Sequence, residues 1–399
     1  MWWVLFIILF FLIVSAWGRY DYSQGLKQLR EERVPTISKH SFSETMLLTT
    51  GEDFLDQLLD DVLKAKKHVH IQFYIFRSDQ TGKRVIDSLC KKAEEGVEVR
   101  LLVDRFGCKL SHSLKKKLSS AGVDFYCSAT LKRPYLFFSL NRRNHRKLAI
   151  IDGKISYIGG FNVGDEYLGR NPFFGFWRDF HLRITGEGSA LVQEQFLQDF
   201  KAVSRTKLPN RDSFFPKLEQ GTQPLQFLST SGVGLERQLI TMIEHATHSL
   251  IICTPYYIPS KQLHQAVLDA SQRGINVSLI LPEKADHPLV KHGATPFVME
   301  AIRAGVLVYH YYRGFYHVKA IIADKNDCLL GTPNFDRRSL HLNDEMSCIS
   351  KDPSFINQVL SVVNYDLSIS TNVTLEKLEH RPILDKIKER IAAPFAGLL

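Results

Sequence analysis

The sequence lacks the features of several protein classes. Its 399 residues include 15 Pro and 24 Gly, too few for a collagenous or a Pro- and Gly-rich disordered chain. The six Cys form no Cys-x-x-Cys pair and no dense framework, so we expect free thiols in a reducing compartment. Acidic residues are the minority charge, 42 against 51 Lys and Arg, and the net charge of +9 favours an anionic partner such as acidic lipid or nucleic acid.

A long apolar run is present at the N-terminus. Residues 1–17 are almost wholly apolar and span roughly 25 Å at 1.5 Å per residue, slightly less than a ~30 Å hydrocarbon core. We expect residues 1–20 to be an uncleaved, single-pass anchor in the cell membrane. The alternative is a cleaved signal peptide, because Val14 and Ala16 have the spacing that signal peptidase accepts. The run is followed by the cations Arg19, Lys27, Arg30 and Arg33, which favour a cytoplasmic body.

After the anchor, the same order of predicted elements occurs twice. The first set is helix 53–67, strand 68–76, helix 81–95, strand 97–104, helix 111–120 and strand 123–126. The second set is helix 235–246, strand 249–258, helix 261–273, strand 275–281, helix 296–304 and strand 306–311. The predicted fold class is α/β, with two homologous halves that each carry a mainly parallel sheet flanked by helices. We divide the chain into a connector (21–46), a first half (47–208), a linker (209–224) and a second half (225–399).

Each half ends its repeat with the same motif, His-x-Lys followed by four residues and Asp. The first copy comprises His145, Lys147 and Asp152, with Asn162 further along; the second comprises His317, Lys319 and Asp324, with Asn334 at the same spacing. A single copy is expected by chance in roughly several per cent of such chains. For a single copy, a purely structural interpretation, with a His in the core and a Lys that snorkels to solvent, is as good as a functional one. Two copies with matched spacing indicate a functional site.

The motif has a chemical interpretation. We expect each His and Lys to lie on a strand and to point the same way, because side chains two residues apart share a face. Two His and two Lys suit exchange at a phosphodiester: one imidazole attacks phosphorus, the other protonates the departing alkoxide, and the lysines with Asn162 and Asn334 neutralise phosphate oxygens. Such a reaction requires no metal or other cofactor. Asp152 and Asp324 are counted among the predicted catalytic residues, and the alternative for both is a structural role, because Asp favours the turns that end strands.

Each imidazole needs a partner that fixes its tautomer. Asp179 and Glu345, both downstream of a motif, are the candidates for this role. The alternatives are surface carboxylates, or an ordinary ion pair between Asp179 and Arg178.

The duplicated motif resembles that of the phospholipase D superfamily, and further segments resemble its bacterial cardiolipin synthases. These segments are TPYYIP (254–259), LPEKADHP (281–288), WRD (177–179) and the run from GTPNFDRRS to NDE (331–345). The likeness covers residue 47 to the C-terminus. It implies one site shared by both halves, where a phosphatidyl group held on a His passes from one phosphatidylglycerol to another with release of glycerol.

The resemblance also implies roles for individual residues. His145 is expected to be the nucleophile and His317 the acid, oriented by Glu345 and Asp179, and the reverse assignment is the alternative. Thr332 stands where the superfamily often has a hydroxyl beside phosphate, and Gly160 occupies that position in the first half.

The implied partners are phosphatidylglycerol, anionic membrane lipid and the membrane itself, and nucleic acid is not expected. Segments 132–143 and 172–177 mix aromatic rings with cations, as interfacial segments do, and the alternative is hydrophobic core with solvated edges. Synthases of this type commonly have two N-terminal membrane helices, whereas this chain has one apolar run. The alternative functions are another activity of the superfamily, such as a phospholipid hydrolase, phosphatidylserine synthase or nuclease, or a non-enzymatic protein that binds anionic lipid.

Overall fold

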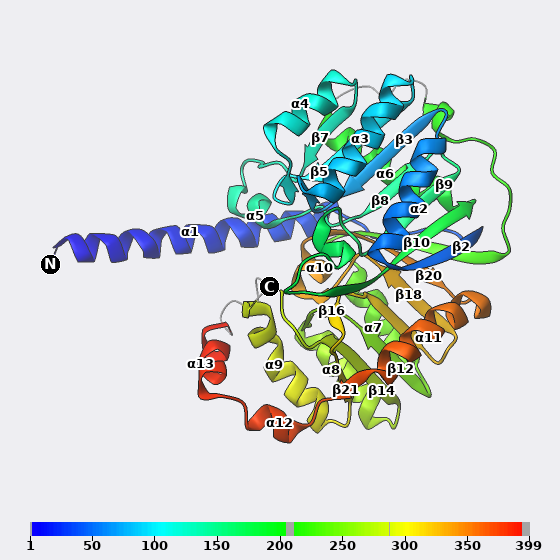
Figure 1. Ribbon diagram of the computed structural model, residues 1–399. Coiled ribbons are helices and arrows are strands. Elements are labelled where there is room, and N and C mark those ends of the chain that lie inside the picture. Colours follow the sequence, from blue (N-terminus) through cyan, green and yellow to red (C-terminus); the bar gives the residue numbers. More distant parts are fainter. Residues whose placement is uncertain (1, 205–210, 287, 393–399) are drawn as a thin grey trace.

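The structure, a computed structural model, describes residues 2–204, 211–286 and 288–392 (Figure 1). A long helix, α1 (Trp2–Glu32), projects from an α/β body whose two halves lie one above the other in this view. The predicted α/β fold with two similar halves and an N-terminal apolar helix is therefore confirmed.

The two halves have the same order of elements. The first contains β2 (Ser41–Thr50), α2 (Gly51–Lys64), β3 (His68–Phe73), α3 (Gln80–Glu94), β5 (Glu98–Asp104), α4 (His112–Ser120), β7 (Asp124–Ser128), β8 (Leu148–Ile151), β9 (Ile155–Gly159), β10 (Phe176–Gly186) and α6 (Gly188–Ser204). The second contains β11 (Gln223–Ser231), α7 (Leu235–His245), β12 (Ser249–Cys253), α8 (Lys261–Gln272), β14 (Asn276–Pro282), α9 (Pro288–Arg303), β15 (Leu307–Tyr311), β17 (Ala320–Ala323), β18 (Asp327–Gly331), β20 (Asp344–Ser350) and α11 (Pro353–Ser368). Helices such as α2 form because one face is apolar and buried and because a side-chain oxygen, here that of Thr50, caps the first turn.

One continuous sheet joins the halves. Its strand order is β7-β5-β3-β8-β9-β10-β2-β11-β20-β18-β17-β12-β14-β15. The strands of the βα units, β3-β5-β7 and β12-β14-β15, are parallel, and hairpins β8–β9 and β17–β18 extend each set toward the middle. The equivalent strands β2 and β11 pair antiparallel at the centre, with Ser43 opposite Gln223. This seam brings the motif-bearing segments of both halves to the middle of the molecule.

The predicted connector is not a connector in the structure. Helix α1 continues through it to Glu32, β1 (Thr36–Ile37) follows, and β2 begins at Ser41 as a full strand of the first half. The hydropathy pattern does not predict this strand, because the polar residues Ser41 and Ser43 occupy buried positions in it. Their hydroxyls are satisfied locally: Ser41 donates to the Leu225 carbonyl (3.1 Å), and Ser43 accepts from the Gly188 amide (2.9 Å).

Other boundaries also differ from the prediction. Helix α9 begins at Pro288 rather than at residue 296, so Pro296 lies inside the helix and not at its first turn. Predicted strand 68–76 ends at Phe73 before a short β4 (Phe76–Arg77), and strand 249–258 is broken into β12 and a short β13 (Tyr257–Ile258). Residues 205–210, which include the start of the predicted linker, lie outside the described residues, and β11 begins at Gln223.

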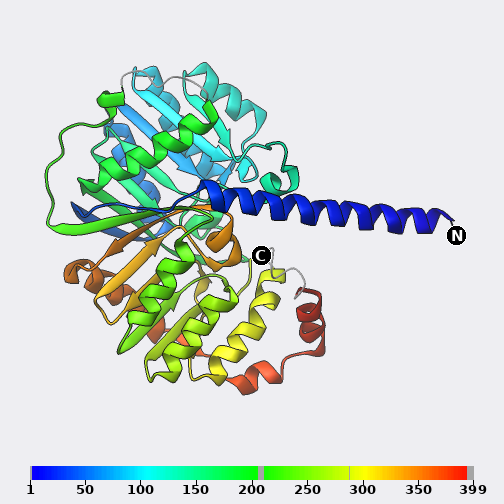
Figure 2. The same cartoon turned by 180° about the vertical axis from the view of Figure 1, so that it is seen from behind.

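The C-terminal half of α1 is docked on the body through α5 (Leu136–Asn141) (Figure 2). Asp21 is buried and accepts a hydrogen bond from the Phe138 amide (2.9 Å). Gly25 permits close approach, because a Cβ there would overlap the Phe138 ring. The apolar N-terminal half is exposed, and within the described residues α1 is the helix long and apolar enough to cross a membrane. The apolar part and the docked part therefore form one continuous helix of about 46 Å.

Candidate active site

The two motif segments cross the seam between the halves. The His145 amide donates to the Asp344 carbonyl (2.9 Å), and the His317 amide donates to the Arg178 carbonyl (2.7 Å). The prediction that His and Lys lie on a strand is wrong, because both pairs precede their strands, β8 and β17, in extended segments whose amides bond to the opposite half. The cross-half bonds replace the regular sheet ladder at these positions.

Each imidazole is paired with a carboxylate of the other half. Nδ1 of His145 lies 3.0 Å from both oxygens of Glu345 in β20, and Nδ1 of His317 lies 2.5 Å from Oδ2 of Asp179 in β10. Arg178 instead pairs with Asp366 (3.1 Å), so Asp179 is not its salt-bridge partner. With Nδ1 directed to a carboxylate, Nε2 of each ring is left for a ligand.

Burial controls the charge of the motif residues. The imidazoles are 8% and 7% exposed, and the lysines are buried deeper. Burial lowers the pKa of His145 and lowers that of His317 to about 3. It also lowers the pKa of Lys147 to about 7 and that of Lys319 to about 8, although the carboxylates of Glu345 and Asp179 oppose it.

The charges of the two motifs act on each other. Lys319 of the second half contributes to lowering the pKa of His145, and Lys147 of the first half contributes to lowering that of His317. Burial raises the pKa of Glu345, but His145 and Lys147 outweigh it and lower this pKa overall. The motif residues therefore share one electrostatic environment, in which both carboxylates stay ionised and an added phosphate would stabilise protonated imidazole and ammonium groups.

Two hydroxyls hold Glu345 in place. Thr332 donates to Oε2 (2.5 Å), and Ser339 donates to Oε1 (2.8 Å). Thr332 also accepts from the Met346 amide (3.0 Å), so its hydroxyl is engaged within the protein and does not face a phosphate as predicted. Ser339 was not predicted, although it lies in the GTPNFDRRS run. At the equivalent place in the first half, Gly160 leaves room for Asp179, because a Cβ there would overlap that carboxylate.

The two Asn residues are also engaged. Oδ1 of Asn162 accepts from the Ile75 amide (3.0 Å), and Nδ2 of Asn334 donates to Asp336 (3.1 Å). Asn334 lines the same small cavity as Lys319, and its buried Oδ1 has no hydrogen-bond partner in the part of the chain that the structure describes. Asn334 therefore retains an unused polar atom beside the site, whereas Asn162 fixes the loop after β3.

Asp152 and Asp324 are not brought to the site. The Asp152 carboxylate accepts from the amides of residues 66, 67 and 68 (2.9, 2.7 and 2.9 Å), and Asp324 accepts from those of residues 247, 248 and 249 (2.7, 2.7 and 2.8 Å). Both carboxylates tie the turn after β8 or β17 to the start of the neighbouring strand. The alternative structural role fits them, and the predicted catalytic role does not. No group of three or more His, Cys, Asp or Glu side chains within the described ranges is arranged to hold a metal ion.

Aromatic rings enclose both imidazoles. The Tyr74 ring centroid lies 4.9 Å from that of His145, and the Trp177 centroid lies 5.0 Å from that of His317. Trp177, in β10, is buried, but Phe173, in the turn before β10, is 60% exposed. For segment 172–177 the two alternatives were an interfacial segment and hydrophobic core. One part of the segment is core and another part is exposed.

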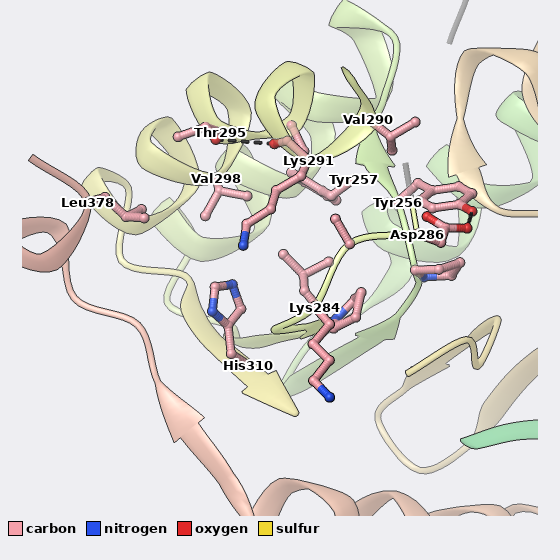
Figure 3. Close-up of a pocket in the computed structure, with 15 residues that line it drawn as sticks. Tyr256, Tyr257, Lys284, Asp286, Val290, Lys291, Thr295, Val298, His310 and Leu378 are labelled. Atoms are coloured by element: carbon pink, nitrogen blue, oxygen red, sulfur yellow. Dashed lines mark hydrogen bonds between the residues drawn. The ribbon is translucent and has the colours of Figure 1, made fainter. Parts of the chain in front are cut away.

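A cavity of about 80 Å³ lies in the second half (Figure 3). Its walls are mostly apolar and include Val298 of α9, while Lys291 and His310 project into it. At one side the Tyr256 hydroxyl donates to Asp286, whose charge also raises the pKa of Lys319. The motif residues do not line this cavity, and Asp286 links it to Lys319 through its charge.

Comparisons with known proteins identify the family. The family model of the cardiolipin synthase phospholipase D-like domain matches residues 58–172 and 239–367. The minor cardiolipin synthase of Bacillus subtilis is 37% identical over 379 residues, covering 95% of this chain and 94% of that protein. The cardiolipin synthase of Oceanobacillus iheyensis is 41% identical, covering 88% of this chain and 74% of that protein.

A solved structure also shares the fold. The phosphatidylserine synthase of Haemophilus influenzae superposes with a TM-score of 0.70 at 16% identity, covering 94% of this chain and 97% of that one. The sequence relatives match most of this chain. This chain belongs to the phospholipase D-like family of cardiolipin synthases.

Proposed function

We propose that this protein synthesises cardiolipin by transferring a phosphatidyl group from one phosphatidylglycerol to the terminal hydroxyl of another, with release of glycerol. The observation that carries the proposal is the pair of cross-half contacts, His145 with Glu345 and His317 with Asp179. They present two tautomer-fixed imidazoles from opposite halves, which is what a two-step displacement at phosphorus needs.

In the first step, Nε2 of one imidazole attacks phosphorus, a P–N bond forms and the P–O bond to glycerol breaks. The other imidazole, protonated, gives its proton to the glycerol alkoxide. In the second step, the imidazole that gave up its proton takes a proton from the terminal hydroxyl of the second phosphatidylglycerol. The oxygen of that hydroxyl attacks phosphorus, the P–N bond to the first imidazole breaks, and cardiolipin forms. Lys147 and Lys319 stabilise the charge on the phosphate oxygens, and no cofactor takes part.

We assign His145 as nucleophile and His317 as acid. Burial lowers the pKa of both imidazoles, so either ring can be neutral for the attack, and the reverse assignment is the alternative. Bound phosphate would raise the pKa of both rings. Identification of the phosphorylated His therefore settles the assignment.

The surroundings of the site favour a lipid over nucleic acid. The apolar half of α1 supplies a membrane anchor, and the cavity lined by Tyr256 and Val298 has apolar walls suited to the apolar part of a lipid. Cations that follow the apolar run, such as Arg19 and Lys27, favour a cytoplasmic body. These features support phosphatidylglycerol and anionic membrane lipid as partners.

Incubation of the full chain in detergent with labelled phosphatidylglycerol, a chelator and no CTP tests the proposal. Cardiolipin with an equal amount of glycerol is the expected result. Phosphatidic acid instead of cardiolipin would identify a hydrolase, and absence of any glycerol release would contradict both activities.

A further inference from the structure

Helix α13 (Ile383–Ala392) packs against α9 with its polar side. Arg381, just before α13, forms an ion pair with Glu389, and both side chains are largely buried, at 17% and 11% exposure. Nη1 of Arg381 also lies 3.6 Å from Sδ of Met299 in α9. The largely buried side of α13 therefore carries a charged group, Glu389, paired with Arg381.

The opposite side of α13 is apolar and exposed. Ile383, Leu384 and Ile387 are 75%, 68% and 47% exposed. At about 100° per residue, Glu389 lies roughly on the far side of the helix from Ile383 and Ile387. A surface helix of a water-soluble domain has the reverse arrangement, with its apolar side toward the core. An apolar outer face indicates an apolar environment outside the protein.

Cations border the apolar face. Lys386 and Arg390 lie on one side of it and Lys388 on the other, and all three are exposed. Lys388 pairs with Asp385 at 3.6 Å, in a contact that is itself largely open to solvent. Apolar side chains flanked by cations are typical of a helix that lies in the headgroup layer of an anionic bilayer.

The position of α13 agrees with this environment. In Figures 1 and 2, α13 is the part of the body that reaches furthest in the direction in which α1 projects, and it lies level with the middle of α1. The apolar run of α1 ends near Trp17, at about that level. Helix α13 and the boundary between the membrane-spanning and docked parts of α1 therefore lie at a similar height.

We propose that the apolar face of α13 inserts into the headgroup layer of the membrane that α1 spans, as a second membrane contact. The inference rests on membrane attachment through α1, which is part of the proposed function. Since α1 and α13 approach the bilayer at separate points, the two contacts together restrict the tilt of the body.

Photolabelling tests this contact without relying on catalysis. The full chain is reconstituted in vesicles of phosphatidylcholine and phosphatidylglycerol that contain a phospholipid with a carbene precursor near its headgroup, and labelled peptides are mapped by mass spectrometry. We expect label in the α13 peptide and none in α2. Absence of label from α13 while α1 is labelled would overturn the inference and leave membrane attachment intact.

Substitutions provide a matched comparison. Ile383→Glu/Ile387→Glu should lower labelling of α13 about tenfold, since placing charge on the inserted face opposes burial of apolar area. Leu63→Glu, on α2 at the opposite side of the body, alters a residue of similar exposure (45%) and should change nothing. Equal α13 labelling in both variants, with unchanged melting in detergent, would overturn the inference. Turnover of the α13 variant should fall in vesicles but not in detergent micelles, whereas failure of the proposed function removes turnover from both.

Discussion

The carboxylate of Glu345, in the second half, lies 3.0 Å from Nδ1 of His145 in the first half. Asp179 of the first half makes the reciprocal contact with His317 of the second. Neither half therefore contains a complete His–carboxylate pair, and both pairs form only where the halves meet along the seam of β2 and β11.

Neutralising the carboxylates should impair catalysis more than folding. In Asp179→Asn and Glu345→Gln the imidazole loses the group that fixes its tautomer and stabilises its protonated form, so we expect kcat to fall by about 10²- to 10⁴-fold. The rate of cardiolipin formation in mixed micelles measures the effect. A fall of less than about tenfold, with the fold intact by circular dichroism, would show that the carboxylates do not act on the imidazoles.

The motif aspartates should behave differently. Asp152→Ala and Asp324→Ala each leave three backbone amides without their acceptor, so we expect a loss of about 1–3 kcal/mol in the free energy of unfolding. The kcat of the folded fraction should stay within a few fold of the wild type, since neither carboxylate reaches the imidazoles. Chemical denaturation and active-site titration separate the two effects. Loss of kcat at full stability would restore the catalytic assignment of these residues.

Activity should depend on the lysine charges. Lys147 and Lys319 have pKa values of about 7 and about 8 in the lipid-free site, so kcat/KM should decline as pH rises through this range and the ammonium groups lose their protons. Bound anionic lipid favours the charged forms and should move the corresponding decline of kcat to higher pH. A kcat/KM that stays constant from about pH 6 to 9 would contradict this role.

His181 should make the fold sensitive to acid. Its buried imidazole stacks on Phe54, has no hydrogen-bond partner among the described residues, and has a pKa that burial lowers to about 3. Below the ordinary pKa of about 6.5, the imidazole of His181 binds a proton in the unfolded chain but not in the native state. The free energy of unfolding is therefore unaffected by this group above pH 6.5 and falls as the pH drops below it, by about 2 kcal/mol at pH 5.

The variant His181→Phe removes this titration and should flatten the dependence of Tm on pH between about 7 and 5. Other buried imidazoles, such as His68 with a pKa of about 4, keep part of the dependence. His40 is exposed, so His40→Phe serves as the control. An identical pH dependence in wild type and His181→Phe would show that His181 does not titrate as expected.

Sequence patterns predicted the elements whose signal is local. The apolar stripe of α2 and the paired motifs identified the two halves and the imidazoles directly. Strand β2 was missed because Ser41 and Ser43 occupy its buried positions, and no hydropathy pattern marks such a strand. The start of α9 was misplaced because Pro296 resembles a first-turn proline.

Roles that depend on distant partners could not be derived from spacing. Thr332 has the position expected of a phosphate contact, but its hydroxyl is directed to Glu345, a relationship fixed by how β20 lies beside β18. The Asp152 carboxylate reaches amides more than eighty positions earlier in the chain, which are adjacent only through the β3–β8 pairing. In both cases the three-dimensional register, rather than the residue type, determines the role.

The central claim is that the imidazoles of His145 and His317 act on one phosphorus atom. Samples with phosphatidylglycerol labelled at phosphorus, quenched in detergent at mildly alkaline pH where the P–N bond is stable, measure this directly by locating phosphohistidine in wild type, His145→Ala and His317→Ala. We predict that both variants lose turnover and that the label is found on a single His, which is His145 in our assignment. His317→Ala, which lacks the acid, should keep the label on His145. Label on each His independently of the other, or turnover above about one per cent in either variant, would contradict a shared site.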